Sequence, residues 1–206
     1  MDVYKKTKKL MKKKESFREY LMDWVPPKEV ESIWEKTCNK LSDILIQFPD
    51  VPKGEKMHAE NSIFPNAAFY LVFKELYPEK AFDMIEDLMA RDAKKIGDSL
   101  KKCVKIPGFK SFFLWSWDPG SRSFWGPKCG FDTVFYPKEK YVFKMDIYDC
   151  PYRRYTTQLG CFEINKLFCE IDIHSYGDLP GMKFTRTQTL ATGGKLCDFK
   201  IEILRE

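Results

Sequence analysis

The last quarter of the chain alternates apolar and polar residues on both sides of a glycine pair, and this pattern constrains the fold more than any other. Residues 184–204 read FTRTQTLATGGKLCDFKIEIL. Adjacent glycines supply the positive φ angles of a tight reversal at no steric cost. The pattern predicts an antiparallel hairpin with a two-residue turn at Gly193 and Gly194, in which Thr192 pairs with Lys195.

One face of this predicted hairpin is apolar but includes an arginine. Because side chains alternate between the two faces of a strand, the covered face comprises Phe184, Arg186, Gln188, Leu190, Cys197, Phe199, Ile201 and Ile203. Burying an unpaired guanidinium is strongly unfavourable. Arg186 therefore needs a carboxylate, either from the protein or from an anionic ligand. Arg186, Gln188 and Cys197 are candidate substrate-binding residues.

The positive charge of the chain is concentrated at its start. The net charge is +5, but residues 1–14 contain seven lysines and one aspartate, so the remainder has a net charge of −1. We expect residues 1–14 to form a basic, flexible segment and residues 15–206 to form a single domain. No basic face runs through the body of the chain, which argues against a nucleic-acid partner. No signal peptide or membrane-spanning segment is recognisable, so we expect a cytoplasmic protein without a membrane partner.

Cysteine spacing argues against a preformed metal centre. The chain has seven cysteines and no CxxC pair. An odd number of cysteines without an export signal indicates free thiols. The commonest zinc-ligand spacing is absent, so we predict no metal and no cofactor.

The first hundred residues have helical periodicity. Apolar stripes and proline positions predict helices over about 6–24, 27–48, 61–76 and 78–103. An aromatic cluster follows between Pro107 and Pro127, around an apparent Asp-Pro-Gly turn. It forms either core or the wall of a pocket in which a flat small molecule could stack. Trp115 and Trp117 are its candidate ligand contacts.

The stretch CFEINKLFCEIDIHSY at 161–176 is the densest collection of reactive groups. Its apolar residues recur at i, i+3, i+4 and i+7, which favours a helix over a strand. The helical interpretation places Glu163, Glu170 and His174 along one flank of the apolar stripe. It places Asn165, Cys169 and Asp172 along the other.

Three segments together resemble the L-2-amino-thiazoline-4-carboxylic acid hydrolase family. They are DCPY at 149–152, CEIDIH at 169–174 and FTRTQTLATGGKLCDF at 184–199. The match is strongest over 150–204. The resemblance implies hydrolytic opening of a thiazoline ring to N-carbamoyl-L-cysteine, a step of cysteine biosynthesis, with a small-molecule substrate.

This reaction assigns possible roles to the reactive residues. Arg186 would hold the substrate carboxylate by a two-point fork. Asp172 or Glu170 would take a proton from water, and His174 would return one to the leaving sulfur. Alternatively, Cys150, Cys169 or Cys197 would attack the ring carbon as a thiolate. A third possibility is a metal that activates water, held by cysteines together with Asp172 or His174.

The pattern as a whole predicts an α+β fold. We expect N-terminal helices packed on one face of a four-stranded antiparallel sheet, built from hairpins at 131–148 and 182–204 and joined through the helix after Cys161. A cysteine-bearing sheet covered by helices also resembles small-molecule-binding domains related to 4-vinyl reductases. The alternative function is therefore a sensor-like domain that binds a ligand without turnover.

Overall fold

The helices of the N-terminal half lie close to the positions that the prolines and apolar stripes of the sequence predict. The computed structural model describes residues 2–204. Its contacts separate the chain into two units, each described by itself: one holds the residues up to Met89 together with Arg154–Ile164, and the other holds the remainder. None of the helices in the described residues is long and apolar enough to cross a membrane.

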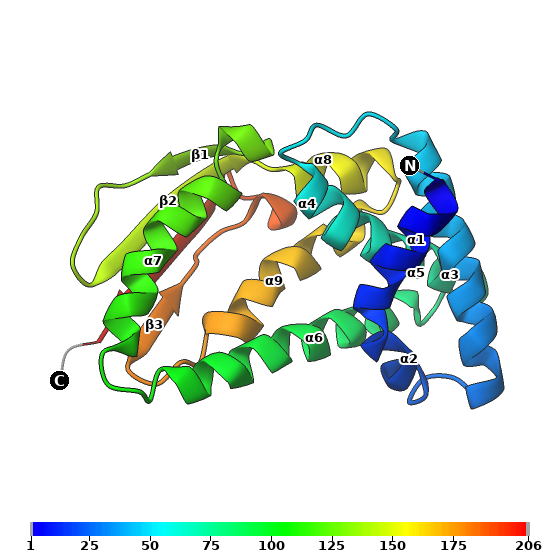
Figure 1. Cartoon of the computed structure of the whole chain (residues 1–206), viewed down its shortest axis with the longest axis horizontal. Coiled ribbons are helices and arrows are strands. Elements are labelled where there is room, and N and C mark those ends of the chain that lie inside the picture. The colour runs from blue at the N-terminus through cyan, green and yellow to red at the C-terminus, as the bar shows by residue number, and fades with distance from the viewer. Residues whose placement is uncertain (1, 205–206) are drawn as a thin grey trace. The chain divides into compact units, whose positions relative to one another are not determined.

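The first unit is helical (Figure 1). The helix at 27–47 is amphipathic, whereas the helix at 64–76 is mostly apolar and is buried from Phe64 to Tyr70. Pro27 and Pro65 stand in their first turns, where a missing N–H group costs little. Its helices are α1 (Val3–Met11), α2 (Ser16–Leu21), α3 (Pro27–Gln47), α4 (Lys56–His58), α5 (Phe64–Leu76), the first part of α6 (Ala81–Cys103) and most of α8 (Pro151–Gln158). Short 3-10 turns at Lys12–Lys14 and Phe162–Ile164 and a π turn at Ala59–Ile63 complete it.

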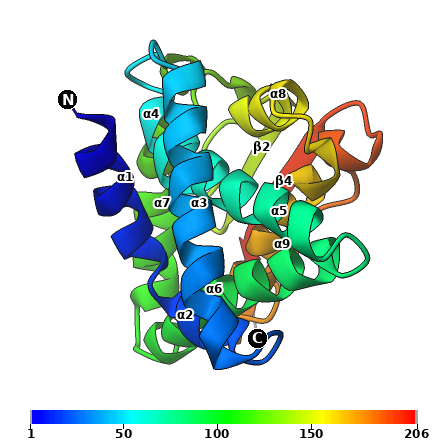
Figure 2. The same cartoon turned by 90° about the vertical axis from the view of Figure 1, so that its right-hand side faces the viewer.

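The lysine-rich start is not the solvated segment that its charge suggests. α1 packs against α3 (Figure 2), and Thr7, Leu10 and Met11 are buried. The hydroxyl groups of Thr7 and Ser42 lie 2.8 Å apart, within hydrogen-bonding distance. Lys6 forms an ion pair with Glu60 at 2.7 Å. Lys5, Lys8 and Lys9 are exposed, so the helix is amphipathic.

The second unit contains the sheet. Its strands are β1 (Asp132–Phe135), β2 (Val142–Asp149), β3 (Met182–Thr185) and β4 (Cys197–Ile203), in the order β1-β2-β4-β3 with every pair antiparallel. The helices that contact the sheet within this unit are α7 (Phe109–Phe124) and α9 (Asn165–Tyr176). A 3-10 turn at Pro127–Cys129 precedes β1. The predicted α+β class, the four-stranded antiparallel sheet and the helix after Cys161 are confirmed.

The predicted turn of the second hairpin is wrong, although the predicted faces are right. Phe184 pairs with Ile201 and Thr185 with Lys200, which is two residues from the expected register. Pairing ends at Thr185, and residues 186–196 form a long loop that includes a 3-10 turn, η5 (Leu190–Thr192). A shift of two residues preserves the face of every side chain, whereas a shift of one would invert it. Arg186 therefore remains on the covered side.

The aromatic segment is also more regular than predicted. α7 continues through Asp118, Pro119 and Gly120, so the expected turn there is wrong. Pro119 lacks an N–H group and gives up one helical hydrogen bond. Aromatic packing offsets this loss, since the Trp117 ring stacks on Phe199 with centroids 6.2 Å apart and lies 5.0 Å from the Phe113 ring.

Candidate functional site

The loop at 186–196 is held by the carboxylate of Asp198, on the neighbouring strand. One Asp198 oxygen, Oδ1, accepts hydrogen bonds from the backbone N–H groups of Thr187 at 2.9 Å and Gln188 at 2.8 Å. The other, Oδ2, accepts from the Thr187 hydroxyl at 2.8 Å. These bonds lower the pKa of Asp198 against the opposing effect of burial. The Asp198 carboxylate thus supplies hydrogen-bond acceptors to loop N–H groups that a neighbouring strand would otherwise supply.

The rest of the loop closes on itself. The Gln188 side-chain oxygen accepts from the Lys195 N–H at 3.0 Å, and the Thr189 carbonyl accepts from the Gly194 N–H at 2.8 Å. Gly193 has a φ of 87°, which a side chain would strain. A Cβ atom on Gly194 would approach the Thr189 carbonyl to 2.8 Å. The segment TLATGG therefore forms a compact loop rather than a two-residue turn.

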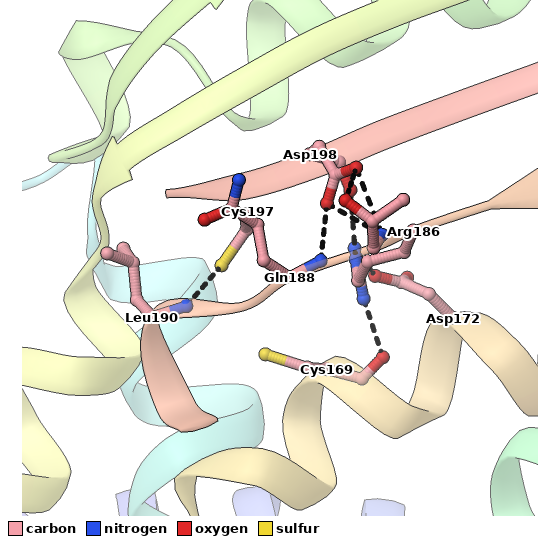
Figure 3. A network of polar contacts seen from close by, with 8 residues as sticks. Cys169, Asp172, Arg186, Gln188, Leu190, Cys197 and Asp198 are labelled. Atoms are coloured by element: carbon pink, nitrogen blue, oxygen red, sulfur yellow. Dashed lines mark hydrogen bonds and ion pairs between the residues drawn. The ribbon is translucent and has the colours of Figure 1, made fainter. Parts of the chain in front are cut away.

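Arg186 meets an acid of the protein. Its Nη2 donates to Asp172 Oδ2 at 2.7 Å, its Nη1 to the Cys169 carbonyl at 2.8 Å and its Nε to the Asp198 carbonyl at 3.2 Å (Figure 3). Only 7% of the Arg186 side chain is exposed, against 25% for Asp172. The guanidinium also lies over the ring of Phe184, 5.3 Å from its centroid. The sequence left open whether Arg186 pairs with a carboxylate of the protein or with an anionic ligand. In the structure its partner is the carboxylate of Asp172.

Asp172 is perturbed by this environment. Burial raises the pKa of its carboxyl group, and the adjacent Arg186 opposes the rise without cancelling it. A carboxylate with a raised pKa accepts protons more readily near neutral pH than an exposed one does. The direction of this shift is the one that a general base requires.

Two cysteines lie beside this ion pair. Cys197 points from β4 toward the side of α9 that carries Cys169 (Figure 3), and its Sγ accepts a hydrogen bond from the Leu190 N–H at 3.2 Å. The neighbouring Cys169 thiol, the Leu190 N–H group and the charge of Arg186 together lower the pKa of Cys197 to about 7, although burial opposes them. The same thiol–thiol contact raises the pKa of Cys169. Cys197 is therefore the thiol of the pair that ionises more readily.

Cys150 belongs to the same buried cluster. It lies in the core of the second unit with Cys197, and its presence contributes to the raised pKa of Cys169. No group of three or more His, Cys, Asp or Glu side chains is placed to hold a metal ion within residues 2–204.

The other predicted catalytic residues do not join this network. His174 follows Asp172 by two positions, about 200° around a helix, and its side chain is exposed. Glu170 precedes Asp172 by the same offset and is half-buried. Asp172 and Cys169, three positions apart, share one side of α9, and both contact Arg186. Cys169 and Asp172 thus lie along one flank of α9, and His174 lies away from them.

The two tryptophans take different positions. Trp117 is partly buried and packs against Phe113 and Phe199 of the core. Trp115 is 62% exposed and lines a surface hollow between α7 and the segment 136–144, with a volume of about 250 Å³. The Trp115 ring is therefore the one available to a ligand from solvent.

Two groups of the site were not found from the sequence. Asp198 was not among the residues of the covered face of the predicted hairpin, and the Leu190 backbone N–H carries no sequence signal. An indication was present for Asp198, because an aspartate opposite unpaired N–H groups of Thr and Gln commonly accepts hydrogen bonds from them. It was hidden by the assumption of a two-residue turn, which left no free N–H groups.

Comparison with known proteins identifies a family for this sequence. The sequence model of the L-2-amino-thiazoline-4-carboxylic acid hydrolase family matches residues 56–201. The match begins well before residue 150 and so includes part of the helical half. No curated protein and no solved structure gives a significant match. Because the family model spans most of the chain, the protein belongs to the L-2-amino-thiazoline-4-carboxylic acid hydrolase family.

Proposed function

We propose that this protein hydrolyses a 2-amino-thiazoline-type ring, with L-2-amino-thiazoline-4-carboxylate as the reference substrate and N-carbamoyl-L-cysteine as the product. The observation that carries the proposal is the environment of Cys197. A backbone N–H group, a neighbouring thiol and a guanidinium all favour its thiolate form. Among the routes compatible with the sequence, this geometry supports covalent catalysis by Cys197 best.

In the first step, the Cys197 thiolate adds to the ring carbon that lies between sulfur and nitrogen. The bond from this carbon to the ring sulfur breaks, and the leaving sulfur takes the proton of Cys169. Cys169 holds this proton tightly chiefly because of its contact with the Cys197 sulfur. Once that sulfur is bonded to carbon, its negative charge is gone and the Cys169 proton becomes easier to release.

In the second step, water adds to the same carbon and the Cys197 thiolate leaves. Asp172 takes a proton from the attacking water and passes it to the former ring nitrogen. The second proton of the water restores the thiol of Cys169, and the oxygen remains as the carbamoyl carbonyl group. One substrate and one water thus give one product. Arg186 holds Asp172 in place and contributes positive charge near both sulfur atoms.

The test is turnover of the thiazoline acid, followed by mass spectrometry of the product. We expect Cys197→Ser to lower kcat by at least about a hundredfold, because a serine hydroxyl is not ionised near neutral pH. Cys103→Ser is the matched control, since Cys103 is also a free cysteine of the second unit but lies at the end of α6. Equal turnover by both variants would exclude Cys197 as the nucleophile.

Ligand binding without turnover is the second candidate, and the hollow beside Trp115 favours it. Aromatic side chains of Trp115, Tyr136 and Tyr141 and the aliphatic stem of Lys138 line this hollow. Flat ligands stack on such rings. If the protein is a sensor, an aromatic ligand should quench tryptophan fluorescence and be recovered unchanged, while the thiazoline acid is not consumed.

A further inference from the structure

The Leu190 N–H group can stabilise a thiolate only if the loop holds it in place. Residues 186–196 make no strand pairing, and η5 spans only Leu190–Thr192. A backbone amide in an unsupported loop would exchange its partner for water, so its bond to sulfur would add little. The position of the Leu190 N–H group therefore depends on whatever anchors the loop.

Asp198 is the anchor on the strand that carries Cys197. Its carboxylate accepts hydrogen bonds from the Thr187 and Gln188 N–H groups and from the Thr187 hydroxyl, at 2.8 to 3.0 Å. Two residues further on, the Leu190 N–H group reaches the Cys197 sulfur. The loop is thus attached at two consecutive residues of β4, first at the Asp198 carboxylate and then at the Cys197 sulfur.

Asp198 cannot favour the thiolate through its charge. Successive side chains of a strand point to opposite faces, so Asp198 and Cys197 diverge from β4. A nearby negative charge disfavours a second one. By charge alone, removing Asp198 would lower the pKa of Cys197. By loss of the anchor, removing Asp198 would raise it. The two effects have opposite signs, which makes them separable.

Building on the proposed nucleophile, we propose that Asp198 is a positioning residue. It fixes the loop 186–196 so that the Leu190 N–H group faces the Cys197 sulfur, and it thereby sets the reactivity of that thiol. The Gln188 side chain also helps to fix the loop, because its oxygen accepts a hydrogen bond from the Lys195 N–H group. Asp198 touches no reacting atom in this account.

The neighbouring strand offers a matched control. Asp146 on β2 is the cross-strand partner of Asp198, and it accepts a hydrogen bond from the Tyr136 hydroxyl at 2.7 Å rather than from the loop. Asp146→Asn removes a charge close to that of Asp198 and leaves the anchor intact. It therefore reports the electrostatic effect alone.

The experiment measures alkylation of Cys197 by iodoacetamide as a function of pH, with the Cys197 peptide quantified by mass spectrometry. The midpoint of the pH profile is the readout, since a loosened loop would also change the absolute rate by exposing the thiol. The full-length protein is used without substrate. Failure of the inference is thus distinguishable from failure of the proposed reaction, which is tested by turnover.

We expect Asp198→Ala to raise the midpoint by about one pH unit, the size of one lost hydrogen bond to a charged group. Asp198→Asn should raise it less, because its amide oxygen can still accept the two N–H groups. Asp146→Asn should leave it unchanged or slightly lower. Thr187→Val removes one hydrogen bond to the Asp198 carboxylate and no charge, so it should raise the midpoint slightly. It replaces Asp198→Ala as the test if that variant does not fold. A midpoint that falls or stays constant in all Asp198 and Thr187 variants would overturn the proposal.

Discussion

At the scale of single residues, Arg186 shows what the alternation of apolar and polar residues along a strand can predict. The pattern predicted a buried guanidinium that requires an acid, and the structure supplies Asp172 at 2.7 Å. The prediction did not depend on the correct turn, because any register with the same parity places Arg186 on the covered face. The identity of the acid could not be predicted, since it comes from α9 and depends on tertiary packing.

Replacing Arg186 by lysine tests this pairing. Lysine keeps the charge but cannot donate to Asp172, the Cys169 carbonyl and the Asp198 carbonyl at once. We expect the free energy of unfolding of the ligand-free protein to fall by about 1 to 3 kcal/mol. Urea denaturation of the parent and the variant measures this difference in the free energy of unfolding. A variant as stable as the parent would mean that the guanidinium is in solvent.

The two aspartates of the site should affect stability with opposite dependence on pH. The pKa of Asp172 is raised in the folded state, chiefly by burial, so its contribution is complete below the unfolded pKa and declines as pH rises through the folded value. The pKa of Asp198 is lowered, because its hydrogen bonds outweigh the opposing burial, so its contribution is present above the unfolded pKa and declines as pH falls through the folded value.

Urea titrations between pH 3 and 7 would separate these contributions. The stability difference between the parent and Asp172→Asn should shrink as pH rises above about 4, the ordinary aspartate pKa. The difference between the parent and Asp198→Asn should instead shrink as pH falls below about 4. Slopes of the same sign for both variants would contradict the assignment of the two environments.

At the scale of elements, periodicity located the helices and strands better than the connections between them. The apolar stripe of α9 was sufficient to identify it as a helix, and both hairpins form strands near the predicted positions. The wrong predictions concern two turns, where tertiary packing overrode the local turn signals. Gly193 and Gly194 serve a long anchored loop, and Pro119 lies within a helix whose aromatic side chains pack on the sheet.

α1 provides a test of docking at this scale. Leu10 is buried where α1 meets α3, while the adjacent Lys9 is exposed. We expect Leu10→Ala to destabilise the protein by about 2 to 4 kcal/mol through lost burial and a residual cavity. Lys9→Ala should change stability by no more than about 0.5 kcal/mol. Similar small effects of both substitutions on chemical denaturation would restore the interpretation of a flexible segment.

At the scale of the whole molecule, charge and cysteine content led to expectations about partners and metals that remain predictions. We expect the purified protein to contain less than one zinc ion per chain by elemental analysis, and chelators to leave thiazoline turnover unchanged. One tightly held ion, lost on replacing Cys150 or Cys169 by serine, would favour a metal-activated water over the thiolate.

The candidate site was predictable in part. Cys169, Asp172, Arg186 and Cys197 were all identified as reactive groups from their pattern, and the structure brings them together. The lowered pKa of Cys197 was not predictable, because it arises from a backbone N–H group and from the neighbouring Cys169 thiol. Contacts of this kind depend on the path of the backbone, which side-chain patterns do not determine.

The central claim is that Cys197 attacks the thiazoline ring, and trapping the covalent intermediate tests it most directly. The protein is mixed with the thiazoline acid, quenched in acid within the first turnover and digested for mass spectrometry. The account predicts that the Cys197 peptide, and not the Cys103 peptide, gains the mass of one intact substrate. It also predicts that Asp172→Asn increases the amount trapped, because the water step is slowed. Turnover without an adduct on Cys197 in either protein would contradict it.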